Sequence, residues 1–130
     1  MTTWTSDELS QIGMAEELEI ESRRGDGTLR KPVIIWVVRY GDDLYVRAVN
    51  GRISAWFRST QTRHEGRIQA GGVGKDVDFV EIDASDSIND QIDATYRTKY
   101  RRYAATIINS IISPKARSAT IKLVPRPTGA

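Results

Sequence analysis

The chain has 130 residues, of which 39% are hydrophobic and 28% charged, and this composition is typical of one globular domain spanning residues 1–130. It has no cysteine, which excludes disulfides and thiolate metal sites, and no apolar run is long enough to cross a membrane. The first twenty residues also lack the basic start and apolar core of a secretion signal, so we expect a cytoplasmic protein.

The net charge is only +2, but the charges are unevenly distributed along the chain. Residues 1–22 hold six acids and no Lys or Arg, whereas residues 23–75 hold eleven Lys or Arg against four acids. A positive middle segment attracts a small anion without making the whole surface bind polyanions, so we expect no nucleic-acid partner. The alternative is that the acidic segment packs beside the basic one and neutralises it.

The first predicted elements are a helix, a strand and a turn. A short helix begins at Thr5 or Ser6, where a capping side chain precedes two acids, and ends near Gly13. Apolar and acidic residues alternate over 18–22, which predicts a half-buried strand. The Gly-Asp-Gly sequence at 25–27 predicts a turn.

The next stretch, VIIWVVRY at 33–40, is β-branched and apolar on both faces. This pattern predicts one strand that is either central in the sheet or part of a barrel wall with apolar cover outside it. A tight turn at Gly41 and Asp42 connects it to a strand over 44–49. Ser54 is placed to cap one or two helical turns after that strand.

The remaining pattern predicts two strands around Gly71 and Gly72, a helix from Ser87 to Tyr103, and a final strand over 119–124. The segment 104–112 fits a helix or a strand equally well. Six short strands, a short N-terminal helix and one longer helix late in the chain favour an α+β fold built on an antiparallel barrel.

Four cations flank the Gly-Asp-Gly turn at the entrance of the apolar stretch 33–40. Arg offers a planar fork suited to phosphate and Lys a point charge, so this cluster indicates a site for a phosphorylated ligand. The alternative is a hairpin tip that is basic only because it is exposed to water. The four cations are Arg23, Arg24, Arg30 and Lys31.

A second group follows the strand over 44–49. Asn50 and Gly51 allow unusual backbone angles, Arg52 is another anion donor, and Trp56 offers a wide plate for a ring. Trp36 and Trp56 are nevertheless residues that more often belong to a core than to a stacking site.

No catalytic signature is present in the sequence. His64 is the only histidine and has no cluster of ligands around it, so we expect no metal site. The chain has no nucleophile motif, and the glycines of GGVGKD at 71–76 are wrongly spaced for a phosphate-binding or dinucleotide motif. The sequence gives no reason to expect a hydrolase or a kinase.

The stretch RRGDGTLRKPVIIWVVRYGDDLYVRAVNGRISAWFRS at 23–59 resembles the core of the split-barrel flavin-binding proteins, in particular the deazaflavin-dependent nitroreductase branch. The whole chain resembles a small bacterial family of uncharacterised function in that superfamily. The start TWT, the middle HEGRIQAGGVGKDVDFV and the end SPKARSATIKLVPRP carry this second likeness.

The resemblance implies a six-stranded split barrel that forms a homodimer and holds FMN or a deazaflavin near the dimer interface. Carried onto this chain, it implies that one group of residues faces the cofactor phosphate and another lines the cofactor. The first group is Arg24, Thr28, Arg30 and Lys31, and the second is Asn50, Gly51, Arg52 and Trp56.

Two functional hypotheses follow from the residues and the resemblance together. The first is a flavin- or deazaflavin-dependent oxidoreductase of nitroreductase type, in which the cofactor supplies the chemistry and no protein nucleophile is needed. The second is a non-catalytic split-barrel protein that binds a small anionic ligand or a protein partner in the same place. The longer acidic N-terminal segment and the helix over 87–103 distinguish this chain from the nitroreductase branch.

Overall fold

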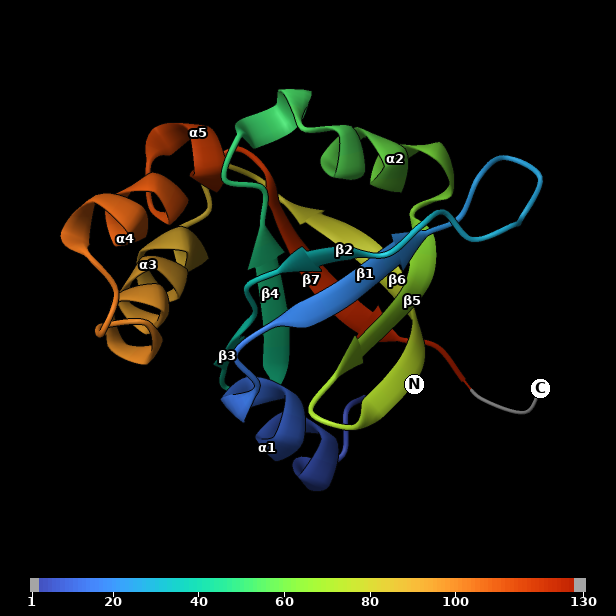
Figure 1. The fold of residues 1–130 in the computed structure, drawn as a ribbon, viewed down its shortest axis with the longest axis horizontal. Coiled ribbons are helices and arrows are strands. Elements are labelled where there is room, and N and C mark those ends of the chain that lie inside the picture. The colour runs from blue at the N-terminus through green and yellow to red at the C-terminus, as the bar shows by residue number, and fades with distance from the viewer. Residues whose placement is uncertain (1–2, 128–130) are drawn as a thin grey trace.

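The structure, a computed structural model, describes residues 3–127 and contains one curled antiparallel sheet in the order β2-β1-β5-β6-β7-β4-β3. Helices lie around its rim and beside one end (Figure 1). The strands are β1 (Leu18–Ser22), β2 (Val33–Ile35), β3 (Val38–Tyr40), β4 (Asp43–Arg47), β5 (Glu65–Ala70), β6 (Val73–Ile82) and β7 (Thr120–Pro125). The helices are α1 (Ser6–Met14), α2 (Ala55–Arg63), α3 (Ile88–Lys99), α4 (Ala105–Ile111) and α5 (Pro114–Arg117), with a 3₁₀ turn η1 (Gly51–Ile53).

The α+β class is confirmed, but the described sheet has seven strands where six were predicted. The apolar stretch 33–40 is two strands, because the chain leaves β2 at one edge of the sheet and enters β3 at the other. Between them, Val37 N–H donates to the Tyr100 hydroxyl at 3.2 Å, and Lys99 Nζ donates to Val37 O at 2.6 Å. Side chains of a distant helix thus replace strand partners at the break.

The prediction that 33–40 is one strand buried on both faces is therefore wrong. Val33 and Ile34 are 36% and 58% exposed on the edge strand β2. The strand with two buried faces is β4, which lies between β7 and β3 and contributes Leu44 to one core and Tyr45 to the other. The sheet curls into a half-barrel (Figure 1). Its edge strands are β2 and β3, which follow each other in the chain.

The helices agree with their sequence signals at the start of the chain and differ later. In α1, Thr5 and Glu8 form the reciprocal bonds of a capping box, which matches the predicted start. The late helix α3 ends at Lys99 instead of Tyr103, and the ambiguous segment after it forms the helix α4.

Two hydrophobic cores lie on the two faces of the sheet. The first fills the curl of the sheet and receives Ile12 from α1 and Phe57 from α2. The second lies between the outer face of β3 and β4 and the helices α3 and α4, where Tyr96 and Tyr100 are fully buried. The helical layer α3–α5 is thus fixed to the barrel by a core of its own.

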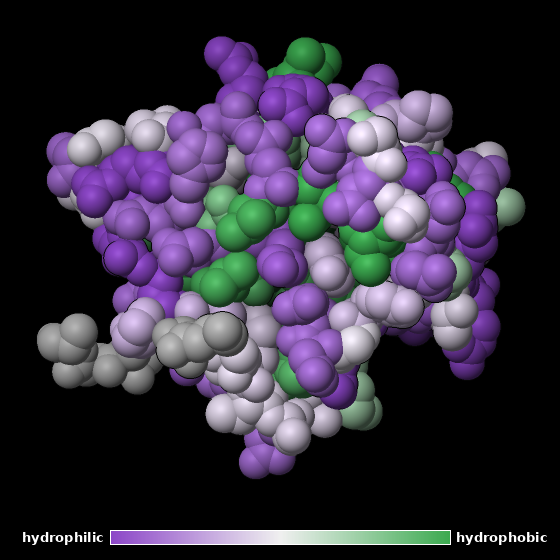
Figure 2. Space-filling model, turned by 180° about the vertical axis from the view of Figure 1, so that it is seen from behind, coloured by the Kyte–Doolittle hydropathy of each residue, from purple (hydrophilic) through white to green (hydrophobic). Residues whose placement is uncertain are grey.

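The surface seen from behind is mostly hydrophilic, and hydrophobic side chains reach it in small groups (Figure 2). Val80 on β6 is one of the exposed apolar residues, at 41%. Among the described residues, the helices are all too short or too polar to cross a membrane.

Candidate functional site

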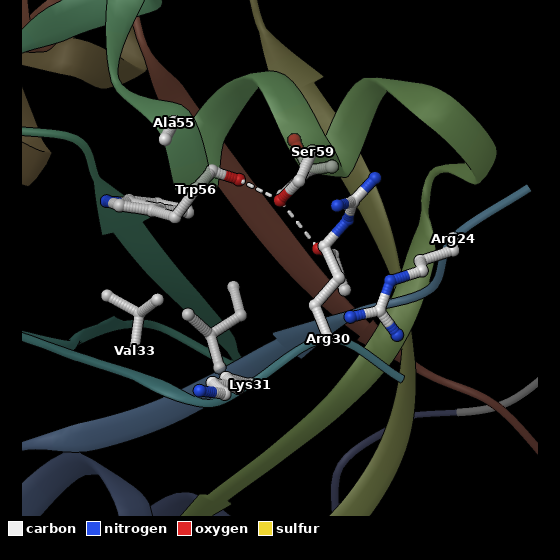
Figure 3. Close-up of a pocket in the computed structure, with 10 residues that line it drawn as sticks. Arg24, Arg30, Lys31, Val33, Ala55, Trp56 and Ser59 are labelled. Carbon is white, nitrogen blue, oxygen red and sulfur yellow. Dashed lines mark hydrogen bonds between the residues drawn. The ribbon is translucent and has the colours of Figure 1, made fainter. Parts of the chain in front are cut away.

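A cleft of about 320 Å³, here called the cationic cleft, opens between β1, the segment that leads into β2, and helix α2 (Figure 3). Three cations, three hydroxyls and an apolar wall line it, and no carboxylate is among the ten lining residues. A cavity with this lining favours an anion that also carries an apolar part. The lining residues are Ile20, Ser22, Arg24, Arg30, Lys31, Val33, Ala55, Trp56, Ser59 and Thr60.

The predicted Gly-Asp-Gly turn shapes the rim of the cationic cleft. Gly27 has a φ of +91°, which a side chain would oppose, and Asp26 Oδ1 accepts hydrogen bonds from Thr28 N at 3.0 Å and Thr28 Oγ1 at 2.7 Å. These bonds from Thr28 hold the pKa of Asp26 below its ordinary value. Arg24 N donates to Thr28 O at 2.8 Å, so the turn holds Arg24 at the cleft.

The cations of the cationic cleft differ in how far the protein already satisfies them. Arg24 donates to Thr28 Oγ1 and Leu29 O, at 3.2 and 3.0 Å. Arg30 has a buried Nε with no hydrogen-bond partner in the described chain. In Figure 3 the guanidinium groups of Arg24 and Arg30 face the same space below α2. A buried donor without a partner costs free energy, so it marks Arg30 as a side chain that the described protein alone does not satisfy.

The floor of the cationic cleft is a chain of hydroxyls. Ser59 Oγ donates to Trp56 O at 2.6 Å and lies 2.6 Å from Ser22 Oγ (Figure 3). Because the single hydroxyl hydrogen of Ser59 is used by Trp56 O, Ser22 must be the donor between the two serines. Both oxygens keep lone pairs, so the floor accepts a hydrogen bond from a ligand hydroxyl or N–H.

A second cavity of about 230 Å³, here called the apolar cavity, adjoins the cationic cleft. Trp56 lines both of them, because α2 carries this side chain between the two spaces. The lining is mostly apolar, with Arg47 and Ser110 as its polar members, and comes from β2 and the residue after it, the end of β4, the start of α2 and helix α4. It consists of Ile34, Ile35, Trp36, Arg47, Val49, Trp56, Ile107, Ser110 and Ile111.

Four of the eight predicted cofactor residues line the cationic cleft: Arg24, Arg30, Lys31 and Trp56. Thr28 lies outside the lining and holds Arg24 in place through its hydroxyl.

The other three predicted residues lie at η1 and its flank and line neither cavity. Asn50 is exposed, and Gly51, at a φ of +77°, is buried against Lys115, whose Cγ would lie 2.4 Å from an added Cβ. Arg52 donates to Glu81 Oε1 and Ser118 O, at 2.9 Å each. Their contacts with a cofactor stay a prediction from the resemblance.

Sequence reasoning missed the two serines of the floor. Ser22 is two residues after Ile20 on β1, so strand alternation was sufficient to place it on the cleft side. Ser59 follows Trp56 by three residues, which puts both on one face of α2.

The acidic N-terminal segment packs beside part of the basic segment but does not line the cationic cleft. Glu8 pairs with Lys75 at 3.1 Å, and Glu21 on β1 lies opposite Arg67 on β5. On β1, Glu19 and Glu21 alternate with the inward residues, so they lie on the other face of the strand. Glu16 bonds to the Tyr103 hydroxyl and to Arg102, and these contacts, that of Tyr103 first, hold the pKa of Glu16 below its ordinary value.

The fold and the cleft define an α+β protein with a curled half-barrel sheet and a cavity lined by three cations at one edge. Residues 8–123 match the family model described as "Uncharacterized protein conserved in bacteria (DUF2255)", and the chain belongs to this family.

Among solved structures, the chain is similar to an F420 reductase. The identity is 14%, the TM-score is 0.55, and the match covers 93% of each chain. At this identity the likeness shows the fold alone. The chain matches no curated protein.

Proposed function

We propose that the protein is a redox enzyme that binds a deazaflavin or FMN, with the phosphate in the cationic cleft and the ring in the apolar cavity. One observation carries the proposal: the two spaces lie on either side of Trp56, one lined by cations and the other mostly apolar, as the two ends of a ligand with an anionic end and a flat apolar end require. The similarity in fold to an F420 reductase favours the deazaflavin.

The residues present fit the phosphorylated end of such a cofactor. Arg30 Nε is buried without a partner, and the cleft holds two further cations and no acid. Arg30 and Lys31 would hold the phosphate, with Arg24 beside them, positioned by Thr28. The hydroxyl floor at Ser22 and Ser59 accepts from a polyol that connects phosphate and ring.

The chemistry of the ring would come from the cofactor, which transfers a hydride when bound. The protein contributes orientation and exclusion of water: Trp56 separates the charged end from the ring end, and Trp36 and Ile111 cover the ring space. Neither cavity is lined by a histidine or a carboxylate, so the protein side chains nearest the ring hold no group that would act as a general base near neutral pH.

The test is a titration of the purified protein with three ligands: a deazaflavin, FMN and inorganic phosphate. We expect the deazaflavin or FMN to bind far more tightly than phosphate, and to quench the fluorescence of Trp56. Trp36 and Trp56 both line the apolar cavity, so Trp56→Phe should lose part of the quench and the double change Trp36→Phe, Trp56→Phe most of it. Trp4, whose indole donates to Leu123 O at 3.0 Å, lines neither cavity and serves as the control position for a Trp→Phe change.

The outcomes separate the two functional hypotheses. Binding of a ring-bearing ligand, followed by its oxidation or reduction with an electron acceptor or donor, supports the redox enzyme. Binding of phosphate with the same affinity as FMN and the deazaflavin supports the non-catalytic anion-binding protein. No binding of any of the three ligands overturns the redox enzyme and the phosphate-binding protein, and leaves a protein partner as the occupant of the cleft.

We also infer that the protein forms a homodimer through the edge of the sheet at β2. Val33 and Ile34 are exposed there beside the apolar cavity, and an open strand edge with apolar side chains is a template for pairing. Sedimentation velocity at micromolar concentration tests this. A monomer that stays a monomer with the cofactor bound contradicts it.

A further inference from the structure

A separate cavity of about 350 Å³ lies between α1, β3 and α3, and it is here called the Lys99 cavity. It shares no lining residue with the cationic cleft or the apolar cavity. No carboxylate lines it, although it holds two cations. Its lining includes the apolar Leu9 and Met14, the hydroxyls of Ser10 and Thr95, and the cations Arg39 and Lys99.

Lys99 is a half-buried amine without a carboxylate partner within 4.0 Å in the described chain. Its Nζ donates to Val37 O at 2.6 Å and lies 5.2 Å from the centre of the Tyr100 ring. Burial lowers the pKa of Lys99 to about 8, and the more distant charge of Glu16 opposes this only in part. A substantial fraction of the amine is therefore neutral, and hence nucleophilic, close to neutral pH.

Arg39 supplies the second cation of the Lys99 cavity. Its Nε donates to Gly41 O at 2.9 Å, and its two terminal nitrogens make no hydrogen bond within residues 3–127. Gly13 of α1 lets this side chain lie close, because a Cβ at that position would be 3.2 Å from Arg39 Cβ. The two terminal nitrogens of a guanidinium can donate parallel hydrogen bonds to the two oxygens of a carboxylate.

We propose that the Lys99 cavity binds small carbonyl compounds that carry a carboxylate, such as 2-oxo acids, and that Lys99 forms an imine with them. Arg39 holds the carboxylate while the neutral Nζ attacks the carbonyl carbon. A C–N bond forms as the C=O π bond breaks, and the carbinolamine then loses water to give the C=N bond. The two hydrogens of the amine leave with the carbonyl oxygen, and no oxidant or reductant is needed.

Val37 O keeps a donor within reach after the reaction. An imine nitrogen no longer donates to Val37 O, but the Tyr100 hydroxyl lies 3.1 Å from the same oxygen. This hydroxyl has one hydrogen and also lies 2.9 Å from Glu16 O, so donating to Val37 O takes that hydrogen from Glu16 O. The reaction therefore moves the missing hydrogen bond from the buried Val37 to the partly exposed Glu16.

The test is reductive trapping of the intact protein with glyoxylate and cyanoborohydride near pH 7.5, followed by peptide mapping by mass spectrometry. We expect Lys99 to carry about tenfold more adduct than any of the other four lysines, since a lower pKa leaves more neutral amine. Acetaldehyde, which has no carboxylate, serves as the second probe. An Arg39→Gln variant should lose most of the glyoxylate adduct at Lys99 and keep the acetaldehyde adduct.

Two results would overturn the proposal. Adducts spread evenly over the five lysines of the unaltered protein would show that Lys99 has no special reactivity, and this mapping needs no variant. Equal loss of both adducts in Arg39→Gln would show that Arg39 shapes the cavity and does not bind the carboxylate. Circular dichroism of Arg39→Gln confirms that the variant is folded before the comparison is made.

Discussion

Arg47 and Arg30 have the same side chain and opposite surroundings. The side chain of Arg47 is 0% exposed and makes five hydrogen bonds within the second core, whereas Arg30 keeps a buried Nε without a partner beside an open cleft. A buried cation with every donor satisfied stabilises the fold, and a cation with free donors in a cavity is available to a ligand. The partners of Arg47 are Asn89, Asp93, Ile111 and Thr120.

The largest expected effect is on Arg47. Replacing it with Met leaves Asp93 buried with a weaker partner and should lower the free energy of unfolding by about 3–5 kcal/mol. Urea denaturation measures this. Arg117→Met is the matched control, because Arg117 also contacts Asp93, at 3.3 Å, but its side chain is 29% exposed. Its replacement should therefore lower the free energy of unfolding by less. If the free energy of unfolding falls less in Arg47→Met than in Arg117→Met, the contacts of Arg47 do not hold helices α3 and α4 on the sheet.

The second prediction concerns Arg30 and Lys31, which should behave in the opposite way. If each holds the phosphate through a charge-assisted bond of about 1.5–3 kcal/mol, the double change to Ala weakens cofactor binding at least 100-fold, allowing for incomplete additivity. The free energy of unfolding should barely change, because neither side chain has a hydrogen-bond partner within the described residues.

Cofactor titration and thermal melting of the double variant, done in parallel with the parent protein, measure the loss of affinity and the change in stability. Unchanged affinity for the ligand that the parent protein binds would remove the phosphate assignment. A large fall in the free energy of unfolding would instead show that Arg30, like Arg47, stabilises the fold.

Lys99 lies between these two extremes, with one partner and partial burial. Burial holds its pKa at about 8, below the value of about 10.4 in an unfolded chain. Between these values the unfolded state binds more protons, so the free energy of unfolding should rise with pH. The rise should be measured from pH 8 to 9.5, because burial raises the pKa of Tyr96 and Tyr100 and this lowers stability once unfolded tyrosines ionise.

The matched variant for this measurement is Lys99→Met, which should give a flatter profile over the same range. An identical slope in the parent and the variant would contradict the assigned pKa. Urea denaturation at four or five pH values is sufficient to compare the slopes.

The smallest effect is expected at Arg52, which is 51% exposed and paired with Glu81 at 2.9 Å. Such a pair is worth about 0.2–1 kcal/mol, so Arg52→Ala should change stability within that range. Cofactor affinity should stay the same, because Arg52 lines neither cavity. A large fall in affinity would restore Arg52 to the site that the resemblance implied.

Much of the fold could be predicted where the signal is local. The capping box at Thr5 and the alternation over 18–22 gave α1 and β1 nearly to the residue. The break inside 33–40 could not be predicted, because the stretch is uniformly apolar. It is made by Tyr100 and Lys99, which are more than sixty positions away in the chain and reach Val37 only after folding.

In the candidate site, too, the features set by neighbouring residues were predictable and those set by distant residues were not. Three of the four cations around the Gly-Asp-Gly turn line the cationic cleft, and their shared hairpin made this predictable from spacing. The fourth, Arg23, does not line it and donates to Gly27 O at 2.7 Å. The burial of Arg47 was not, since alternation alone does not reveal that Asp93 of a distant helix pairs with it. Arg52 was assigned by resemblance, and its position is decided by Glu81 on another strand.

The place of β7 in the sheet has a consequence for synthesis of the protein on the ribosome. Among the described strands, β7 is the last along the chain, and it lies between β6 and β4 and pairs with both. Until β7 emerges, the sheet consists of two parts that share no strand pairing, β2-β1-β5-β6 and β4-β3. Each part has an open edge that can pair with other chains. Every residue that lines the cationic cleft precedes position 61, yet a nascent chain that stops before residue 120 would aggregate and would not offer a partial binding site.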